Sequence, residues 1–162
     1  MAQQHQPNGG VGFSALAVAA AKEFLAAGAF SEPARVPEAL AARWEIKPQH
    51  LTHRDGRRLR RYTFRARSGQ PYQGRFFELL EQNRAKDSIY AQLYRLGIPV
   101  AWLITEDRPG IPTWIPLIRW EKGAEWSTQR LTRSQEAWVR EQTSARQQAA
   151  TGQLAMFTPR KA

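Results

Sequence analysis

Residues 49–67 read QHLTHRDGRRLRRYTFRAR, and this stretch decides the fold. Asp55-Gly56 is a favoured two-residue hairpin turn, so it predicts a β-hairpin with one arm on each side. In the second arm Tyr62, Phe64 and Ala66 alternate with polar residues, which is typical of a strand with one buried face. We therefore expect Tyr62 and Phe64 to belong to a core that packs against helices.

The sequence around this hairpin predicts an α+β domain. Apolar spacing and proline positions indicate helices in four segments. These are 13–29, a short stretch that follows Pro37 and carries Trp44, the region 75–96, and 132–150. Strands are expected at about 100–105 and 113–120, and Pro116 limits the second of these to a sheet edge. With the hairpin at about 49–67, they form a small antiparallel or mixed sheet packed with helices.

Length and composition predict one domain. The chain has 162 residues and no cysteine, which excludes disulfides, thiolate zinc sites and cysteine nucleophiles. We expect residues 1–10 to be disordered, 11–150 to form the domain and 151–162 to be a flexible tail after a helix that stops at Gly152. No apolar run reaches the ~20 residues of a membrane span, so a cytoplasmic protein with no membrane partner is expected.

The charge indicates a polyanionic partner. Lysine and arginine number 24 against 14 acidic residues, giving a formal net charge of +10 and a pI near 10.8. The hairpin segment concentrates this charge in seven arginines. They are Arg54, Arg57, Arg58, Arg60, Arg61, Arg65 and Arg67. Arginines on one strand face repel one another unless an anion faces them, so we interpret them as a nucleic-acid-binding site, with DNA favoured. The alternative is a solvated edge strand whose charges prevent aggregation.

Residues 114–126 are rich in tryptophan and also contain basic residues. Trp114, Trp120 and Trp126 lie among Arg119 and Lys122, a mixture compatible with stacking on unpaired bases. Packing in the core or at its rim is the expected role of these rings.

Residues Gln153-Leu154-Ala155-Met156-Phe157 suggest a protein partner. The pentapeptide resembles the short peptides by which bacterial replication and repair proteins dock on the DNA sliding clamp. The resemblance implies that Gln153 is a polar anchor, that Met156 and Phe157 fill a hydrophobic pocket, and that Leu154 occupies a shallower site. Burial of Met156 and Phe157 would contribute about 1.5–3 kcal/mol each before ordering costs. The alternative is that these two side chains fold back onto their own domain.

Residues 89–105, IYAQLYRLGIPVAWLIT, are similar to the helix-to-strand junction of restriction-endonuclease-like domains. Those enzymes hold magnesium with an aspartate and a carboxylate-x-lysine pair on strands before the helix, and residues 64–67 contain neither. Glu78 and Glu81, placed on one helix face, and the pair Glu106-Asp107 are interpreted as solvated helix face and turn residues. His50 and His53 have no evident third ligand. We expect no catalytic residues, metal or cofactor.

The sequence therefore predicts a nucleic-acid-binding, nucleoid-associated accessory factor. The basic domain would hold DNA while residues 153–157 tether the chain to the bacterial sliding clamp, in replication, repair or mobile-element maintenance. Two alternatives stay open. One is a divergent nuclease-like subunit recruited to DNA, and the other is an RNA-binding protein in which the match to the clamp peptide is accidental.

Overall fold

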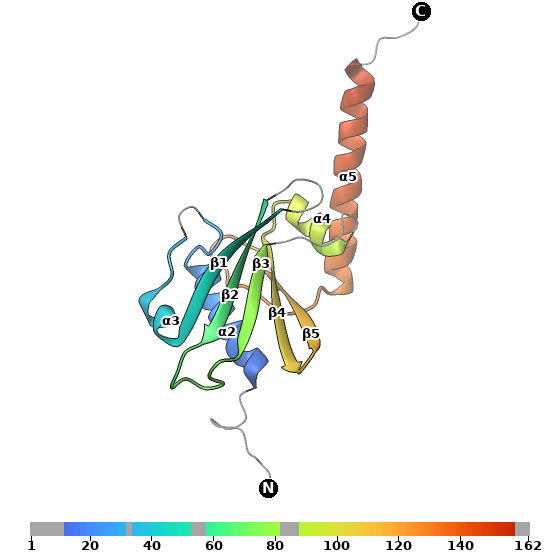
Figure 1. Ribbon diagram of the computed structural model, residues 1–162. Coiled ribbons are helices and arrows are strands. Elements are labelled where there is room, and N and C mark those ends of the chain that lie inside the picture. The colour runs from blue at the N-terminus through green and yellow to red at the C-terminus, as the bar shows by residue number, and fades with distance from the viewer. Residues whose placement is uncertain (1–11, 32–33, 53–57, 82–87, 158–162) are drawn as a thin grey trace, which may run out of the picture.

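The computed structural model describes residues 12–31, 34–52, 58–81 and 88–157, and of Arg58 and residues 153–157 it describes the backbone. These residues form an α+β fold, as predicted (Figure 1). The elements are α2 (Phe13–Ala26), α3 (Glu38–Arg43), β1 (Trp44–Thr52), β2 (Arg58–Ala66), β3 (Phe76–Glu81), α4 (Ile89–Arg95), β4 (Val100–Arg108), β5 (Ile111–Ile118) and α5 (Arg133–Phe157).

The five strands form one antiparallel sheet in chain order, β1-β2-β3-β4-β5. The predicted hairpin is confirmed, because β1 and β2 pair from Trp44 opposite Ala66 to Thr52 opposite Arg58. Its Asp55-Gly56 turn lies outside the described residues. The first arm is longer than predicted: Trp44 begins β1 instead of ending a helix. β1 continues through Pro48, which a sheet edge tolerates because the missing N–H faces no partner strand.

The predicted helix over 75–96 is wrong in its first part, where the chain forms the central strand β3. Phe77 and Leu79 belong to the core under α2, and Leu80 is buried on the opposite face. A strand that buries apolar residues on both faces lacks strict alternation, so its sequence does not show the period of two. Only the end of the segment is helical, as α4, where Ser88 Oγ accepts a hydrogen bond from Ala91 N at 3.1 Å.

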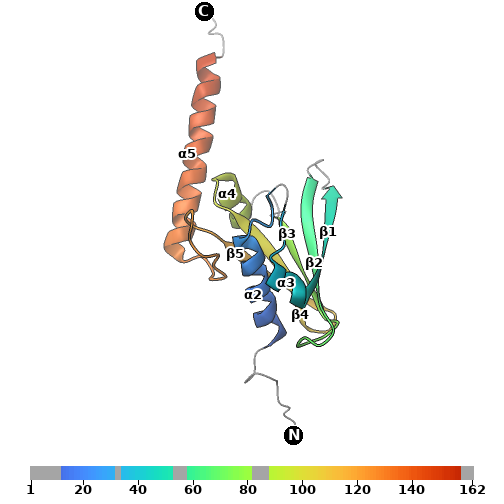
Figure 2. The same cartoon turned by 90° about the vertical axis from the view of Figure 1, so that its left-hand side faces the viewer.

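The main core lies between α2 and one face of the sheet, and α3 borders it (Figure 2). The rings of Phe64 and Phe77, opposite each other on β2 and β3, stack at 4.5 Å with an interplanar angle of 18°. Phe24 of α2 contacts Phe64 edge-on at 5.6 Å. Tyr62 packs edge-on against Phe24 at 4.8 Å and donates its hydroxyl to Ala29 O at 2.7 Å. The predicted core positions of Tyr62 and Phe64 are thus confirmed.

A smaller core joins α4 and α5 to the ends of β4 and β5. It consists of Leu93, Val100, Ile118 and Val139. From there α5 projects away from the rest of the chain (Figures 1 and 2). It passes the predicted end at Gly152 and continues to Phe157, although a glycine in a helix interior costs about 1 kcal/mol. Among the described residues no helix is long and apolar enough to cross a membrane.

Candidate nucleic-acid interface

The face of the sheet opposite α2 is the surface on which the predicted interface is built. Side chains alternate along a strand, and Tyr62 and Phe64 of β2 point toward α2. Thr63 and Arg65, the residues that follow them, therefore point to the face opposite α2. Strand register places five of its residues directly opposite one another in one row across the sheet. The row is Lys47, Thr63, Glu78, Ile104 and Trp114. We call the part of this face around that row the open face. At one end of the same face α4 covers the sheet, where Tyr90 packs on the buried Trp102 at 5.0 Å between ring centroids. Figure 2 shows α2 and α3 on the other side of β1 and β2.

The structure does not keep the predicted arginines together on one surface. Arg54, Arg57 and the side chain of Arg58 lie outside the described residues. Arg60 lies on the helix side of β2, where its guanidinium forms an ion pair with Glu81 at 3.0 Å. Glu81 also accepts the backbone N–H of Arg60 at 2.6 Å, and the pair is largely buried. Arg60 therefore stabilises the junction of β2 and β3 and does not belong to the open face.

Arg61 lies on the open face but is partly neutralised there. Its Nε is 3.1 Å from the carboxylate of Glu78, and its Nη2 donates to Gln49 Oε1 at 2.5 Å. The mutual repulsion expected of the arginine array is thus relieved by glutamates of β3, a segment for which the sequence predicts a helix. The side chains of this pair are 29% and 23% exposed, so the guanidinium keeps an accessible edge at which a phosphate can compete with Glu78.

Arg65 and Arg67 are the exposed cations of the array. Arg65 Nη1 donates to Gly74 O at 2.9 Å, and its guanidinium lies 5.3 Å from the ring centroid of Phe76. Arg67 Nε donates to Ala41 O at 2.7 Å. Within the described ranges neither side chain has a carboxylate at ion-pair distance. Both side chains are exposed and their orientation is fixed by backbone carbonyls, while strand register places Glu45 directly opposite Arg65.

Two exposed aromatic side chains lie on the open face, one of them beside Arg65. Phe76, at the start of β3, is 47% exposed, and Trp114, on the edge strand β5, is 39% exposed. Trp114 is held edge-on against the buried Trp102 at 5.9 Å. Sequence reasoning missed Phe76 because it counted this ring in the apolar set of the expected helix over 75–96. By contrast, Trp126 is buried and Trp120 packs on the smaller core, as expected for tryptophans of that segment.

This combination is suited to unpaired bases. Every base has a flat π-face that stacks on an aromatic ring, and a neighbouring guanidinium can contact the phosphate that follows it. Sheet surfaces with exposed aromatics use this geometry to bind single strands, since bases in a duplex are not free to stack on protein. The open face offers both elements, with Arg65 positioned over Phe76 by its bond to Gly74.

The acidic residues weighed for a metal site are structural in this fold. Glu78 and Glu81 lie on opposite faces of β3, each with an arginine, so the expectation that they share one helix face is wrong. Glu106 accepts the N–H of Gly110 in the β4–β5 turn, and Asp107 accepts both the hydroxyl and the N–H of Ser14 at the start of α2. The described part of the chain contains no group of three His, Cys, Asp or Glu residues that could hold a metal ion.

The backbone of residues 153–157 forms the end of α5, and the side chains of Gln153, Leu154, Met156 and Phe157 lie outside what the structure describes. Comparison of the chain with protein-family models, curated proteins and solved structures gives no match. The resemblance of the pentapeptide to clamp-binding peptides therefore stays a prediction.

Proposed function

We propose that this protein binds single-stranded nucleic acid on the open face of its sheet, as a non-enzymatic accessory factor. The observation that carries the proposal is the half-exposed ring of Phe76 under the guanidinium of Arg65, on a sheet face that α2 and α3 leave uncovered. The net charge of +10 gives the electrostatic attraction, and the aromatic rings give the contacts to bases.

Titration of fluorescent oligonucleotides, followed by anisotropy, tests the proposal. Stacking of one base on an aromatic side chain is worth ~1–3 kcal/mol, so Phe76→Ala should weaken binding of a single strand by about 5- to 150-fold. Arg65→Ala should weaken it as well, whereas Arg130→Ala is the matched control: it removes the same charge from an exposed loop residue between β5 and α5. Equal losses for Arg65→Ala and Arg130→Ala would refute a localised interface.

The choice of oligonucleotide separates the remaining alternatives. A DNA single strand, an RNA of the same sequence and the DNA duplex are titrated in parallel. Stacking on Phe76 requires unpaired bases, so the duplex should bind more weakly than either single strand. Tighter binding of RNA than of DNA would favour the RNA-binding alternative. Tighter binding of the duplex would contradict the stacking model.

The second part of the proposal concerns residues 153–157, which would dock on the bacterial sliding clamp. Its support is the sequence of the pentapeptide and its position at the end of α5, away from the sheet. Clamp peptides bind extended, so the last turns of α5 must unwind, and Gly152 lowers the cost of unwinding by about 1 kcal/mol relative to alanine. Two weak contacts on one DNA–clamp assembly would then reinforce each other through effective concentration.

Calorimetric titration of the whole chain into a bacterial clamp tests this part. Saturable binding that the double substitution Met156→Ala/Phe157→Ala abolishes is the expected result. The control is Gln147→Ala/Gln148→Ala, which alters exposed residues of α5 before the pentapeptide. Absence of binding by the unmodified chain would remove the clamp from the proposal and leave the open face to be judged by the oligonucleotide titrations alone.

A further inference from the structure

A cavity of about 630 Å³ lies beside Phe76, between the start of β3 and the end of β4. It forms where the two strands stop pairing. Glu78 and Ile104 are the last pair, although β4 continues to Arg108. Phe76 and Glu106, each two residues beyond this pair, lie on opposite sides of the resulting gap, and both line the cavity. Its volume is within the range of small-molecule sites, so it can hold one nucleobase.

Arg75, which also lines the cavity, holds the two strand ends at this separation. Its Nη2 donates a hydrogen bond to Glu106 O, and its guanidinium lies 4.2 Å from the ring centroid of Phe13 on α2. The next residue of β4, Asp107, is held by α2 as well, because its carboxylate accepts both the N–H and the hydroxyl of Ser14. The cavity is therefore formed before any ligand arrives, which reduces the ordering cost of binding.

Three different chemical groups surround the place where a base can stack. The ring of Phe76 is 47% exposed and forms one wall. Arg65 is directly opposite Phe76 on β2, and its guanidinium lies 5.3 Å from the ring centroid. Glu106 is on the other side, across the gap between β3 and β4. A base stacked on the ring thus has a guanidinium at one side and a carboxylate at the other.

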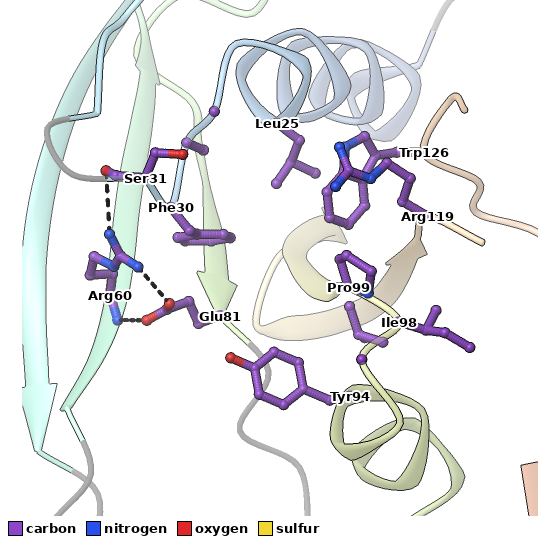
Figure 3. A pocket seen from close by; sticks show the side chains of 14 residues that line it. Leu25, Phe30, Ser31, Arg60, Glu81, Tyr94, Ile98, Pro99, Arg119 and Trp126 are labelled. Atoms are coloured by element: carbon purple, nitrogen blue, oxygen red, sulfur yellow. Dashed lines mark hydrogen bonds and ion pairs between the residues drawn. The ribbon is translucent and has the colours of Figure 1, made fainter. Parts of the chain in front are cut away.

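The Glu106 carboxylate has an oxygen that is available to a ligand. Its Oε1 accepts the N–H of Gly110 at 2.8 Å, which orients the side chain. Within the described ranges Oε2 has no hydrogen-bond partner, and this partly exposed residue forms no ion pair. The glutamates of β3 differ. Glu81 takes two hydrogen bonds from Arg60 on the helix side of the sheet (Figure 3), and Glu78 is already paired with an arginine of β2.

We propose that this cavity selects a base that carries an amino group, and that Glu106 is the residue that recognises it. The inference rests on the proposed function, because it assigns a base preference to the same site. A carboxylate accepts hydrogen bonds and has none to donate, so it pairs with the amino group of cytosine, adenine or guanine. Uracil and thymine carry an oxygen where cytosine carries its amino group, and two acceptors repel each other. Arg65 remains free to contact the phosphate that follows the stacked base.

Two single strands of about 12 nucleotides test the proposal. One consists of deoxycytidine and the other of deoxyuridine, so the two bases share one ring size and differ at the amino group and the ring nitrogen beside it. Fluorescence anisotropy at neutral pH measures both dissociation constants. The deoxycytidine strand should bind about 5- to 30-fold more tightly than the deoxyuridine strand.

Glu106→Gln should bring the ratio of the two dissociation constants close to one. The amide keeps an acceptor for the N–H of Gly110, but it removes the charge and offers a donor to uracil. Glu141→Gln is the control: it removes the same charge from an exposed position on α5 and should keep the ratio of the unmodified chain. If Glu106→Gln fails to fold, judged by circular dichroism, the comparison of the two strands with the unmodified chain decides.

Failure of this inference and failure of the proposed function give different results. Equal binding of the two strands, with both weakened by Phe76→Ala, would overturn the base preference and leave single-strand binding in place. A preference that survives Glu106→Gln would overturn the role of Glu106. Absence of binding by either strand would overturn both proposals.

Discussion

Replacement of Phe77 and of its neighbour Phe76 tests whether residues 76–81 form a strand. In a strand, adjacent side chains point to opposite faces, and here one ring is completely buried while the other is 47% exposed. Phe77 contacts Phe64 at 4.5 Å, Trp44 at 5.1 Å and Phe13 at 6.3 Å between ring centroids. Among the described residues no ring packs on Phe76 in this way, and its contact is with the Arg65 guanidinium on the open face, 5.3 Å from the ring centroid.

The two substitutions should differ severalfold in free energy of unfolding. Complete burial of a phenylalanine removes ~200 Å² from water, worth about 5 kcal/mol at 25 cal/mol per Å², so Phe77→Ala should cost about 3–5 kcal/mol. The Phe76 ring is already about half exposed to water, and its removal also loses one cation–π contact. Phe76→Ala should therefore lower the free energy of unfolding by about 1 kcal/mol. For a chain of this size, each kcal/mol lowers the melting temperature by roughly 2–4 °C.

Urea and thermal unfolding followed by circular dichroism measure both values. Should Phe77→Ala prevent folding, Phe77→Leu and Phe76→Leu repeat the comparison with smaller costs. Equal destabilisation by the two substitutions within about 1 kcal/mol would contradict the strand, because it would place both rings in similar surroundings. The same pair also separates stability from function, since Phe76→Ala should weaken single-strand binding in a protein that remains folded.

Three further substitutions examine single interactions by urea unfolding. Tyr62→Phe removes the hydroxyl that donates to Ala29 O and should cost about 1 kcal/mol, and no change would mean that this bond does not form. Ser88→Ala removes the cap of α4 and should also cost about 1 kcal/mol, whereas Ser88→Thr should recover most of it. A double-mutant cycle of Arg60→Gln and Glu81→Gln should give a coupling of ~1–2 kcal/mol, and additivity would exclude a direct ion pair.

The elements predicted correctly from the sequence are those whose local residue pattern is compatible with one type of secondary structure. In β2, Tyr62, Phe64 and Ala66 alternate with charged or polar residues because the strand buries only one face there, and the pattern is visible in seven residues. The segment VAWLIT contains β-branched and aromatic residues between Pro99 and an acidic end, and it forms β4 as expected. Pro37 correctly indicated the start of α3.

The errors arose where distant residues determine the outcome. The run FFELLE has strong apolar content and no alternation, so whether it becomes helix or strand depends on β2 and β4, which pair with it. The same pairing determines the charge of the candidate site. Register brings Glu78 and Glu81 of β3 to Arg61 and Arg60 of β2, and no local pattern reveals that these four residues neutralise one another. The exposed arginine–phenylalanine pair on the open face has the same origin.

Ion pairing redistributes the charge of the molecule without reducing its excess. Each pair, such as Arg61 with Glu78, removes one cation together with one anion, so the net +10 must be carried by basic residues that face no carboxylate. Arg65 of the open face forms no ion pair among the described residues, and neither does Arg67, which follows β2 and donates to Ala41 O of α3. For a single strand the logarithm of the affinity falls with the logarithm of the salt concentration by about 0.7 per neutralised phosphate, so two or three contacts at these arginines give a slope of roughly −1.4 to −2.1. A much steeper slope would mean that the exposed arginines of α5 also contact the strand, and the interface would then extend beyond the sheet.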